Sequence, residues 1–342
     1  MRARSLAAGL ALAGLAAVTG CASTSGGSGD GSSGTDLSVV GFSVLEAANE
    51  PVFADFEKTD AGKDVTITTS YGASGDQSRA VEGGLDADLV HFSLEPDIQR
   101  LVDSGQVDAG WKDNATKGIA TSSVVVMVVR PGNPKNIQGW DDLIKPGVEI
   151  ITPNPASSGS AKWNILAAWA HVTGAGGSED DAKAFVKKLL GNTISLPSSG
   201  RDATTAFTEG NGDVLLSYEN EAITARANGA DVDYVVPDDT LLIQNPAAVL
   251  KDADPKAADL LAFMTSAAGQ ADYAKSGFRP VVDGVTLPEV VGANDPANPF
   301  PQPTHLYTID DDFGGWATAN TKFFDENEGI ITQLQQETGT LE

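Results

Sequence analysis

The segment Ile150-Ile-Thr-Pro-Asn-Pro-Ala-Ser-Ser-Gly-Ser-Ala-Lys-Trp-Asn164 predicts a strand, a turn rich in Ser and Gly, and the start of a helix. The paired Ile residues favour the strand, and Pro153 and Pro155 end it. Ser and Gly are favoured where a helix begins, because they leave its first backbone N–H groups accessible or cap them. We therefore expect a helix over 160–171. Strand, turn and helix in this order form the repeating unit of α/β proteins.

The same order occurs twice more. Ser70-Tyr-Gly-Ala-Ser-Gly75 follows the alternating segment Val65–Tyr71, and a helix is expected from about Gln77. Pro197-Ser-Ser-Gly-Arg201 precedes a helix expected over 203–209. The helix dipole places partial positive charge where such turns present free N–H groups. Each turn is therefore a candidate anion site that needs no charged side chain, at the strand ends where open α/β sheets bind ligands.

Strand-like and helix-like segments alternate over the rest of the chain. Val124-Val-Val-Met-Val-Val129 is a continuous apolar run, which predicts a strand buried on both faces. A later strand is expected over 247–250. The alternation predicts an α/β protein with mainly parallel sheets and flanking helices. A chain of 342 residues is long enough for about two domains.

Composition excludes several classes of function. The chain has 22 Lys and Arg against 47 Asp and Glu, a net charge of −25, whereas a nucleic-acid-binding protein would carry a basic patch. A single Cys excludes an intrachain disulfide and a Cys-rich metal site. His91, His171 and His305 are too far apart for a local metal motif, and Asp310-Asp-Asp312 lacks the spaced ligands of a calcium loop. We expect no metal and no cofactor.

The N-terminus has the pattern of an export signal. A short basic head precedes the apolar run Leu6–Val18, which is shorter than the about 20 residues of a membrane span. The run ends in Val18-Thr-Gly-Cys21, which resembles the processing site of bacterial lipoproteins. We predict a signal peptide over 1–20, a lipid on Cys21 and a flexible tether over 21–35, so that the protein is anchored to the outer face of the cell membrane. An ordinary secretory signal with an incidental Cys is the alternative.

Enzyme interpretations have little support. Gly72-Ala-Ser-Gly75 is one residue too short for the nucleophile elbow of serine hydrolases, and the chain contains no Ser-x-x-Lys. We therefore expect a protein that is not an enzyme. An extracytoplasmic serine hydrolase is one alternative. Another is an adhesion or structural lipoprotein, in which the three Ser/Gly turns would be helix caps only.

Several stretches together resemble one family. The segment from Ile150 to Asn164 is similar to a hallmark of bacterial sulfate/thiosulfate-binding proteins, which are the substrate-binding components of ABC importers. Further matching stretches follow in order along the chain: Ser70–Gly75, Val129–Pro134, Trp140–Gly147, Gly212–Ala222, Thr308–Asp310 and Phe313–Trp316. The resemblance implies the type II periplasmic-binding-protein fold, with two lobes and a ligand cleft between them.

The resemblance also implies how the chain is divided. Residues 36–122 and 243–342 would form the first lobe, and residues 123–242 the second. Ligand binding would close the lobes by hinge bending and present a surface to the membrane permease of the importer. The protein would act as a monomer.

In this family, neutral donors hold a sulfate dianion. Carried over to this chain, the donor residues are Ser43, Ser74, Ser158, Gly159, Ser160, Gly200 and Tyr218. The hydroxyls of Ser74 and Ser158 would contribute as well as main-chain N–H groups. Tyr218 stands where the family usually has a Trp, and Ser160 replaces a Gly. Asp76 and Asp202 lie beside the first and third turns, and we expect both to face away because a carboxylate would repel a dianion.

The implied function is capture of sulfate or thiosulfate outside the cytoplasm and its delivery to an ABC permease. A site built only of donors suits sulfate, which has no proton to give at neutral pH. Hydrogen phosphate would leave its hydroxyl unpaired, at a cost of about 1–3 kcal/mol. The alternative is a receptor for another tetrahedral oxyanion, such as molybdate, because one sequence does not reveal size selection.

Overall fold

A computed structural model describes residues 34–340 of the chain. The predicted signal peptide, Cys21 and all but the last two residues of the predicted tether lie outside the described residues. The strands are β1 (Thr35–Phe42), β2 (Val65–Gly72), β3 (Leu89–His91), β4 (Ile119–Val129), β5 (Ile150–Ile151), β6 (Thr193–Ser195), β7 (Val214–Tyr218), β8 (Asp233–Val235), β9 (Asp239–Val249) and β10 (His305–Tyr307).

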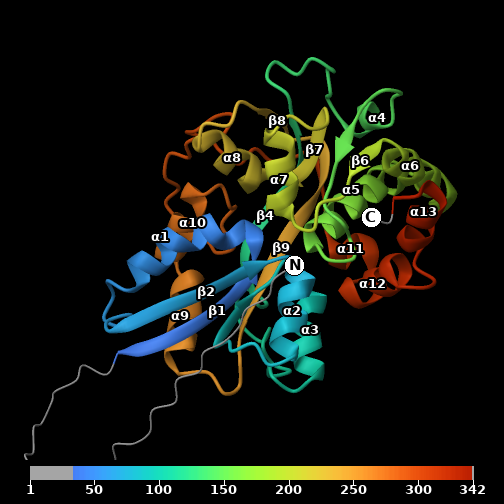
Figure 1. The fold of residues 1–342 in the computed structure, drawn as a ribbon. Coiled ribbons are helices and arrows are strands. Elements are labelled where there is room, and N and C mark those ends of the chain that lie inside the picture. Colours follow the sequence, from blue (N-terminus) through green and yellow to red (C-terminus); the bar gives the residue numbers. More distant parts are fainter. Residues whose placement is uncertain (1–33, 341–342) are drawn as a thin grey trace, which may run out of the picture. The chain divides into compact units, whose positions relative to one another are not determined.

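Helices alternate with these strands along most of the chain (Figure 1). A short 3-10 helix, η1 (Ser43–Leu45), precedes the first α-helix. The α-helices are α1 (Glu46–Phe56), α2 (Ser74–Glu82), α3 (Glu95–Asp103), α4 (Trp140–Leu143), α5 (Gly159–Gly174), α6 (Glu179–Gly191), α7 (Gly200–Thr208), α8 (Glu219–Ala227), α9 (Lys256–Met264), α10 (Ala267–Lys275), α11 (Ile309–Phe313), α12 (Trp316–Phe324) and α13 (Ile330–Thr338).

The strands form one ten-stranded sheet in the order β2-β1-β3-β9-β4-β7-β5-β6, with β10 beside β9 and β8 beside β4. Strands β1, β2 and β3 pair in parallel, as do β5, β6 and β7, which agrees with strands joined through helices. The pairs that β4 makes with β7, β8 and β9, and the pair of β3 with β9, are antiparallel. The centre of the sheet is therefore mixed, and β4 and β9 join its two parallel parts.

The apolar run in β4 is buried on both faces, as predicted. Val124, Val126 and Val128 contribute to the hydrophobic cluster that includes residues of α7 and α8. The alternate residues Val125 and Met127 contribute to the cluster that includes residues of α5 and α6. Successive side chains of a strand point to opposite faces, so one apolar run serves two helical layers.

Strand β1 is covered on both faces in the same way. Leu37 and Val39 belong to the large cluster that includes residues of α1 and α9, whereas Val40 packs with Val81 of α2 and Ile98 of α3. Helices α2 and α3 also contact each other, and α1 contacts α10 (Figure 1). The result is a sheet between two layers of helices, the α/β architecture predicted from the sequence.

Two helices begin earlier than predicted. Helix α2 begins at Ser74 instead of about Gln77, and α7 begins at Gly200 instead of Ala203. The Ser/Gly turns are therefore the first turns of these helices and not loops before them. Strand β9 is also longer than the predicted 247–250, because it pairs with β4 over much of its length.

The C-terminal helices pack mainly against α5 and α6. Trp316 in α12 packs edge to face against Trp163 of α5, with the ring centroids 4.8 Å apart. Trp169 of α5 and Phe323 of α12 pack in the same way, also with a centroid distance of 4.8 Å. Helix α13 contacts α6, and α12 also contacts α3. Aromatic pairs in this geometry add stability beyond the area they bury.

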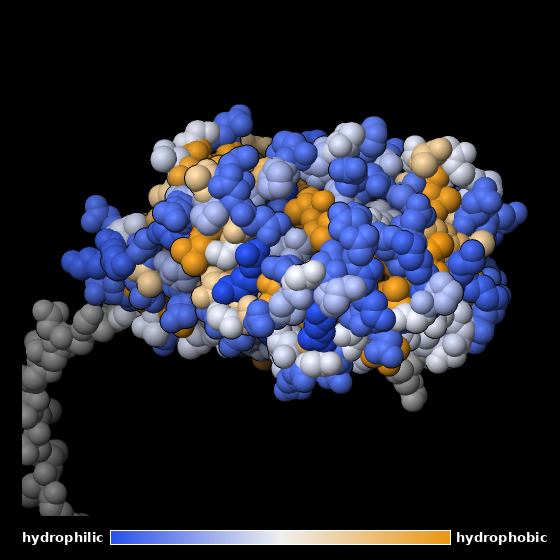
Figure 2. Space-filling view, turned by 90° about the horizontal axis from the view of Figure 1, so that it is seen from above, coloured by the Kyte–Doolittle hydropathy of each residue, from blue (hydrophilic) through white to orange (hydrophobic). Residues whose placement is uncertain are grey.

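The surface is strongly polar. In Figure 2 hydrophilic side chains cover most of the visible face, and hydrophobic ones form separate small patches. Among the residues that the structure describes, no helix has the length and hydrophobicity that crossing a bilayer requires.

Candidate functional site

Several helices begin directly at the ends of strands, and the predicted site residues lie at these helix starts. Ser43 begins η1 after β1, and Ser74 begins α2 soon after β2. Ser158 is the N-cap of α5, Gly200 begins α7, and Tyr218 is the N-cap of α8. Gly159 and Ser160 form the first residues of α5. All seven positions therefore lie where main-chain N–H groups have no partner within their own helix.

The structure brings these helix starts together. The N–H of Gly75 donates to the carbonyl oxygen of Ser157 at 3.1 Å, which joins the first turn to the second. A Cβ added to Gly200 would lie 3.1 Å from Cγ2 of Val44 and 3.4 Å from Oγ of Ser160, so the third turn lies against both η1 and α5.

Ser158 differs from the other Ser and Thr residues that precede helices. The N-caps Ser178, Ser199, Ser266 and Thr308 each accept a hydrogen bond from a main-chain N–H of their own helix. The Ser158 side chain makes no such bond with α5. Ser158 is also only 3% exposed, so water does not take the place of the missing cap. The start of α5 therefore keeps N–H groups and a hydroxyl that a ligand can use.

Ser74 is bonded within the protein at its hydroxyl. Its Oγ donates to Oδ2 of Asp97 at 2.6 Å and accepts from the N–H of Ser93 at 2.9 Å. Because a hydroxyl has one proton, the Ser74 side chain gives that proton to Asp97 in this structure. The Ser158 N–H is likewise used, since it donates to the carbonyl of Asn154 at 2.8 Å.

Ser93 is a residue of this region that we did not predict. It lies between β3 and α3, and its Oγ is 2.7 Å from the hydroxyl oxygen of Tyr218. Its carbonyl accepts from Nε1 of Trp163 at 3.0 Å and from Nδ2 of Asn245 at 3.1 Å. The only sequence signal was a Ser between a strand end and a helix start, without the Gly that marked the other turns.

Charges around the turns are mostly compensated. Burial raises the pKa of Asp97, and the hydrogen bond from Ser74 together with the positive charges of Lys162 and of two Arg side chains opposes this shift. Burial also lowers the pKa of Lys162, which Asp97 in turn holds up. Arg201 forms an ion pair with Glu221 at 2.9 Å.

Asp76 and Asp202, the two acidic residues beside the first and third turns, are both exposed. Asp76 forms an ion pair with Arg79, and Asp202 accepts a hydrogen bond from the Ser198 hydroxyl at 2.5 Å. Neither carboxylate is buried among the helix starts. A negative ligand there would be held by neutral donors, with the carboxylates screened by solvent.

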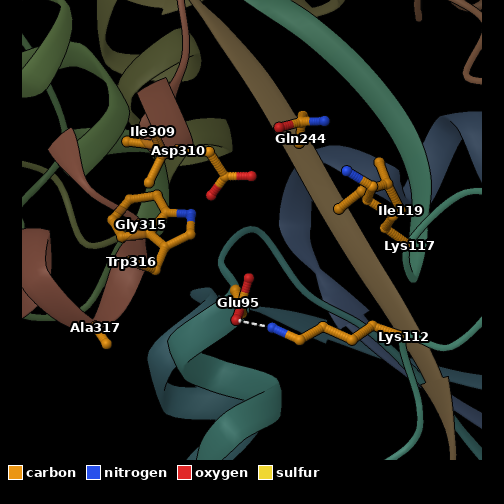
Figure 3. A pocket seen from close by; sticks show the side chains of 10 residues that line it. All are labelled: Glu95, Lys112, Lys117, Ile119, Gln244, Ile309, Asp310, Gly315, Trp316 and Ala317. Atoms are coloured by element: carbon orange, nitrogen blue, oxygen red, sulfur yellow. Dashed lines mark hydrogen bonds and ion pairs between the residues drawn. The ribbon is translucent and has the colours of Figure 1, made fainter. Parts of the chain in front are cut away.

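A separate pocket of about 390 Å³ lies beside Trp316 (Figure 3). It is lined from four parts of the fold, by residues that include Glu95, Lys112, Gln244 and Asp310. None of the seven predicted site residues lines it. Glu95 and Lys112 are paired at 2.6 Å, so two of its charges neutralise each other. Within residues 34–340, no group of three or more His, Cys, Asp or Glu side chains is arranged to hold a metal ion.

Residues 37–279 match the family model described as bacterial extracellular solute-binding protein. The chain belongs to this family. A sulfate-binding protein of Synechococcus elongatus is 40% identical over 311 residues, which cover 88% of this chain and 87% of the relative. A thiosulfate-binding protein of Pseudomonas aeruginosa is 34% identical over 295 residues, 83% of this chain and 86% of the relative.

The solved structure of the sulfate-binding protein SubI from Mycobacterium tuberculosis H37Rv has a TM-score of 0.79 to this solute-binding protein at 46% identity. The match covers 85% of this chain and 100% of that one. These comparisons confirm the resemblance found in the sequence. They also confirm the type II periplasmic-binding-protein fold. The relatives are named as binding proteins and not as enzymes.

Proposed function

We propose that this protein is an extracytoplasmic receptor that captures sulfate and delivers it to an ABC permease without chemical change. The observation that supports it most directly is the start of α5. Ser158 is buried and leaves its own helix uncapped, beside the N–H groups of Gly159 and Ser160. The relatives of this chain that are named for sulfate and thiosulfate support the choice of ligand.

Physical chemistry favours a site of this kind for a dianion. Burying a charge is costly unless its oxygens are hydrogen-bonded. Helix N-termini on a rigid sheet supply polarised donors that need no reorganisation. With a net charge of −25, the chain offers sulfate no long-range attraction, so the affinity must come from local geometry.

The same donors would discriminate against hydrogen phosphate. Its proton needs an acceptor, and the buried carboxylate beside the first turn, Asp97, already accepts from Ser74. An unpaired buried hydroxyl costs about 1–3 kcal/mol, or roughly 5- to 150-fold in affinity.

The test is calorimetric titration of the purified protein with sulfate, thiosulfate, molybdate and phosphate, after unfolding and refolding to remove bound anion. We expect one-to-one sulfate binding and no phosphate signal. At about 100 Kd of sulfate the free energy of unfolding should rise by roughly 2.7 kcal/mol. Binding of molybdate but not sulfate would favour the alternative oxyanion receptor. Silence for all four anions would refute the proposal.

We further propose the two lobes stated from the sequence, 36–122 with 243–342 and 123–242, closing on the ligand as a monomer. Support comes from β4 and β9, which are the strands that join the two parallel parts of the sheet. Helix α12 contacts α3, and its Trp316 packs against Trp163 of α5. The C-terminal helices would therefore touch both lobes. Small-angle scattering with and without sulfate tests closure, which predicts a smaller radius of gyration with the anion.

The proposed anchor is a lipid on Cys21, following cleavage after residue 20. The family is described as extracellular, which supports export. The only Cys of the chain directly follows the predicted signal peptide, which supports the lipid. Cys21→Ser should release the protein from the membrane fraction into the medium. Retention of this variant in the membrane fraction would refute the anchor and leave export intact.

A further inference from the structure

We propose that Ser93 is a further residue of the anion site, a positioning residue that joins the helix starts and orients the Tyr218 hydroxyl toward the anion. The inference rests on the proposed receptor function and goes beyond the donor set taken from the family.

Ser93 uses all of its polar groups in contacts with other site segments. Its N–H donates to Oγ of Ser74, and its Oγ is 2.7 Å from the Tyr218 hydroxyl oxygen. Its carbonyl accepts from the side chains of Trp163 and Asn245 at 3.0 and 3.1 Å. Ser93 is 1% exposed, so water does not compete for these bonds.

These partners belong to four different elements. Ser74 begins α2, Trp163 lies in α5, Tyr218 ends β7, and Asn245 lies in β9. In the sheet, β3 is separated from β7 by β9 and β4. Ser93, just after β3, therefore joins segments that lie on both sides of the two joining strands. Contacts of this kind form only when these segments come together.

The Ser93 hydroxyl also decides where the Tyr218 proton points. Each of these two hydroxyls has one proton, and the bond between them uses only one. Burial raises the pKa of Tyr218, so the phenol keeps its proton, and the nearby Ser93, Asn245 and Ser160 side chains only partly oppose this shift. An oxygen that accepts from Ser93 keeps its own proton for another acceptor. An anion beside Ser160 and Gly159 would be that acceptor.

The start of α5 packs closely against Ser93. A Cβ added to Gly159 would lie only 2.4 Å from Oγ of Ser93, so the first residue of α5 lies directly against it. Ser93→Ala therefore removes the hydroxyl without adding volume, and leaves the main-chain bonds to Ser74, Trp163 and Asn245 in place. This variant isolates the contact with Tyr218.

The experiment is a double-mutant cycle on sulfate binding with Ser93→Ala, Tyr218→Phe and the double variant. Affinities come from calorimetry, and dissociation rates from stopped-flow fluorescence of the Trp residues. We expect each single variant to lose about fivefold in affinity, and the double variant to lose no more than either one, because the two hydroxyls act as a unit. The loss should appear mainly as faster dissociation, since the contact holds the bound state together.

Ser78→Ala is the matched control. Its hydroxyl is equally buried and donates to the carbonyl of Asp97 at 2.7 Å, but it does not contact Ser93 or Tyr218. This variant should lower the melting temperature and leave the sulfate dissociation rate unchanged. Equal effects of Ser78→Ala and Ser93→Ala on dissociation would overturn the inference, as would additive losses in the cycle.

The outcome for the wild-type protein separates this inference from the proposed function. Wild-type protein that binds no oxyanion overturns both. Wild-type protein that binds sulfate, together with an unchanged Ser93→Ala variant, overturns only the role of Ser93. A sulfate loss in Ser93→Ala that Tyr218→Phe does not share would likewise refute the orienting role.

Discussion

The N–H of Gly75 donates to the carbonyl of Ser157 at 3.1 Å, although the two residues lie in turns far apart in the sequence. The Ser157 hydroxyl in turn donates to the carbonyl of Ser198 at 2.7 Å. The three Ser/Gly turns are therefore bonded to one another in series. Donors in turns that are bonded to one another lose little freedom when they bind an anion, which favours affinity.

Ser158→Ala should weaken sulfate binding by about 1–3 kcal/mol, because it removes a donor to a buried charge that no helix cap uses. Ser178→Ala is the opposite case, since Ser178 caps α6 and is not one of the predicted donors. It should lower the free energy of unfolding by about 1 kcal/mol and leave affinity unchanged. Calorimetric titration and denaturant unfolding of both variants measure the two effects. Equal affinities of Ser158→Ala and wild type would remove Ser158 from the site.

Gly159→Ala should impair both folding and binding. The new methyl group would lie 2.4 Å from Oγ of Ser93 and 2.7 Å from Cγ of Leu94, and such overpacking costs about 1–3 kcal/mol. Gly191→Ala at the end of α6 meets no atom within 4 Å, so it should be neutral or stabilising by up to about 1 kcal/mol. Thermal unfolding with and without sulfate compares the two. A Gly159→Ala variant that resembles Gly191→Ala would show that α5 does not approach Ser93 so closely.

Arg279→Met should destabilise the protein by about 3–5 kcal/mol. Arg279 pairs with the buried Glu219 through two bonds of 2.7 and 3.0 Å, and the substitution would leave that carboxylate unpaired. Lys187→Met breaks an exposed pair with Glu337 and should change stability little. Urea unfolding at pH 7 tests the difference. Similar midpoints for the two variants would contradict the burial of the Glu219 pair.

His91 should make the protein less stable in acid. Complete burial lowers the pKa of His91 to about 3, whereas the unfolded value is about 6.5. Between these values the unfolded state binds the extra proton, so the free energy of unfolding falls as the pH decreases, by about 2 kcal/mol from pH 7 to 5. His91→Gln should show a flatter pH dependence in urea unfolding at pH 7, 6 and 5. An unchanged slope would mean that His91 is not held neutral.

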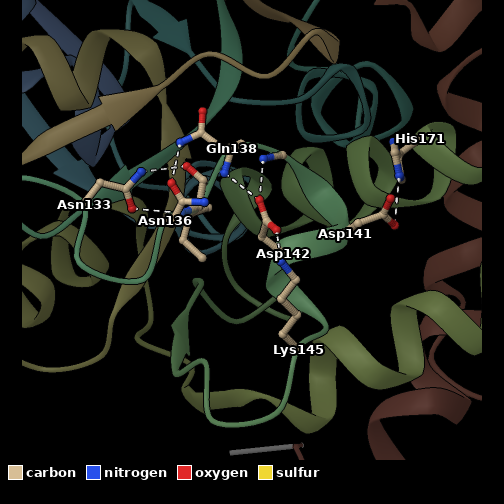
Figure 4. A network of polar contacts seen from close by, with 9 residues as sticks. Asn133, Asn136, Gln138, Asp141, Asp142, Lys145 and His171 are labelled. Carbon is tan, nitrogen blue, oxygen red and sulfur yellow. Dashed lines mark hydrogen bonds and ion pairs between the residues drawn. The ribbon is translucent and has the colours of Figure 1, made fainter.

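His171 provides a control of opposite sign. The hydrogen bond with Asp239, at 2.8 Å, raises the pKa of His171, and the Asp141 carboxylate beside it adds to the shift (Figure 4). Its contribution to stability is therefore present below pH about 6.5 and is lost as the pH rises through the raised pKa. His171→Asn should lower the melting temperature more at pH 5.5 than at pH 8.5. The reverse order would contradict the pairing with Asp239.

Local order along the chain was predictable from the residues themselves. Apolar runs such as Val124–Val129 define buried strands, and Ser or Gly after a strand marks a helix start, because both depend on near neighbours. The same local chemistry identified the turns at Ser74, Ser158 and Gly200, and the structure brings them together. Helix starts were misjudged by three residues because Ser and Gly favour both a loop and a first helical turn.

The sequence by itself determined the α/β class, the acidic surface and the residues at the helix starts, since these depend on composition and short-range pattern. Only the tertiary structure decided which donors remain unpaired. The proton of Ser74 goes to Asp97, and Ser93 meets Tyr218 from a distance of 125 residues along the chain. Such contacts depend on how β4 and β9 align the two parts of the sheet, which no short-range pattern encodes. Hydrogen bonds between distant segments are set by that alignment and therefore by the fold as a whole.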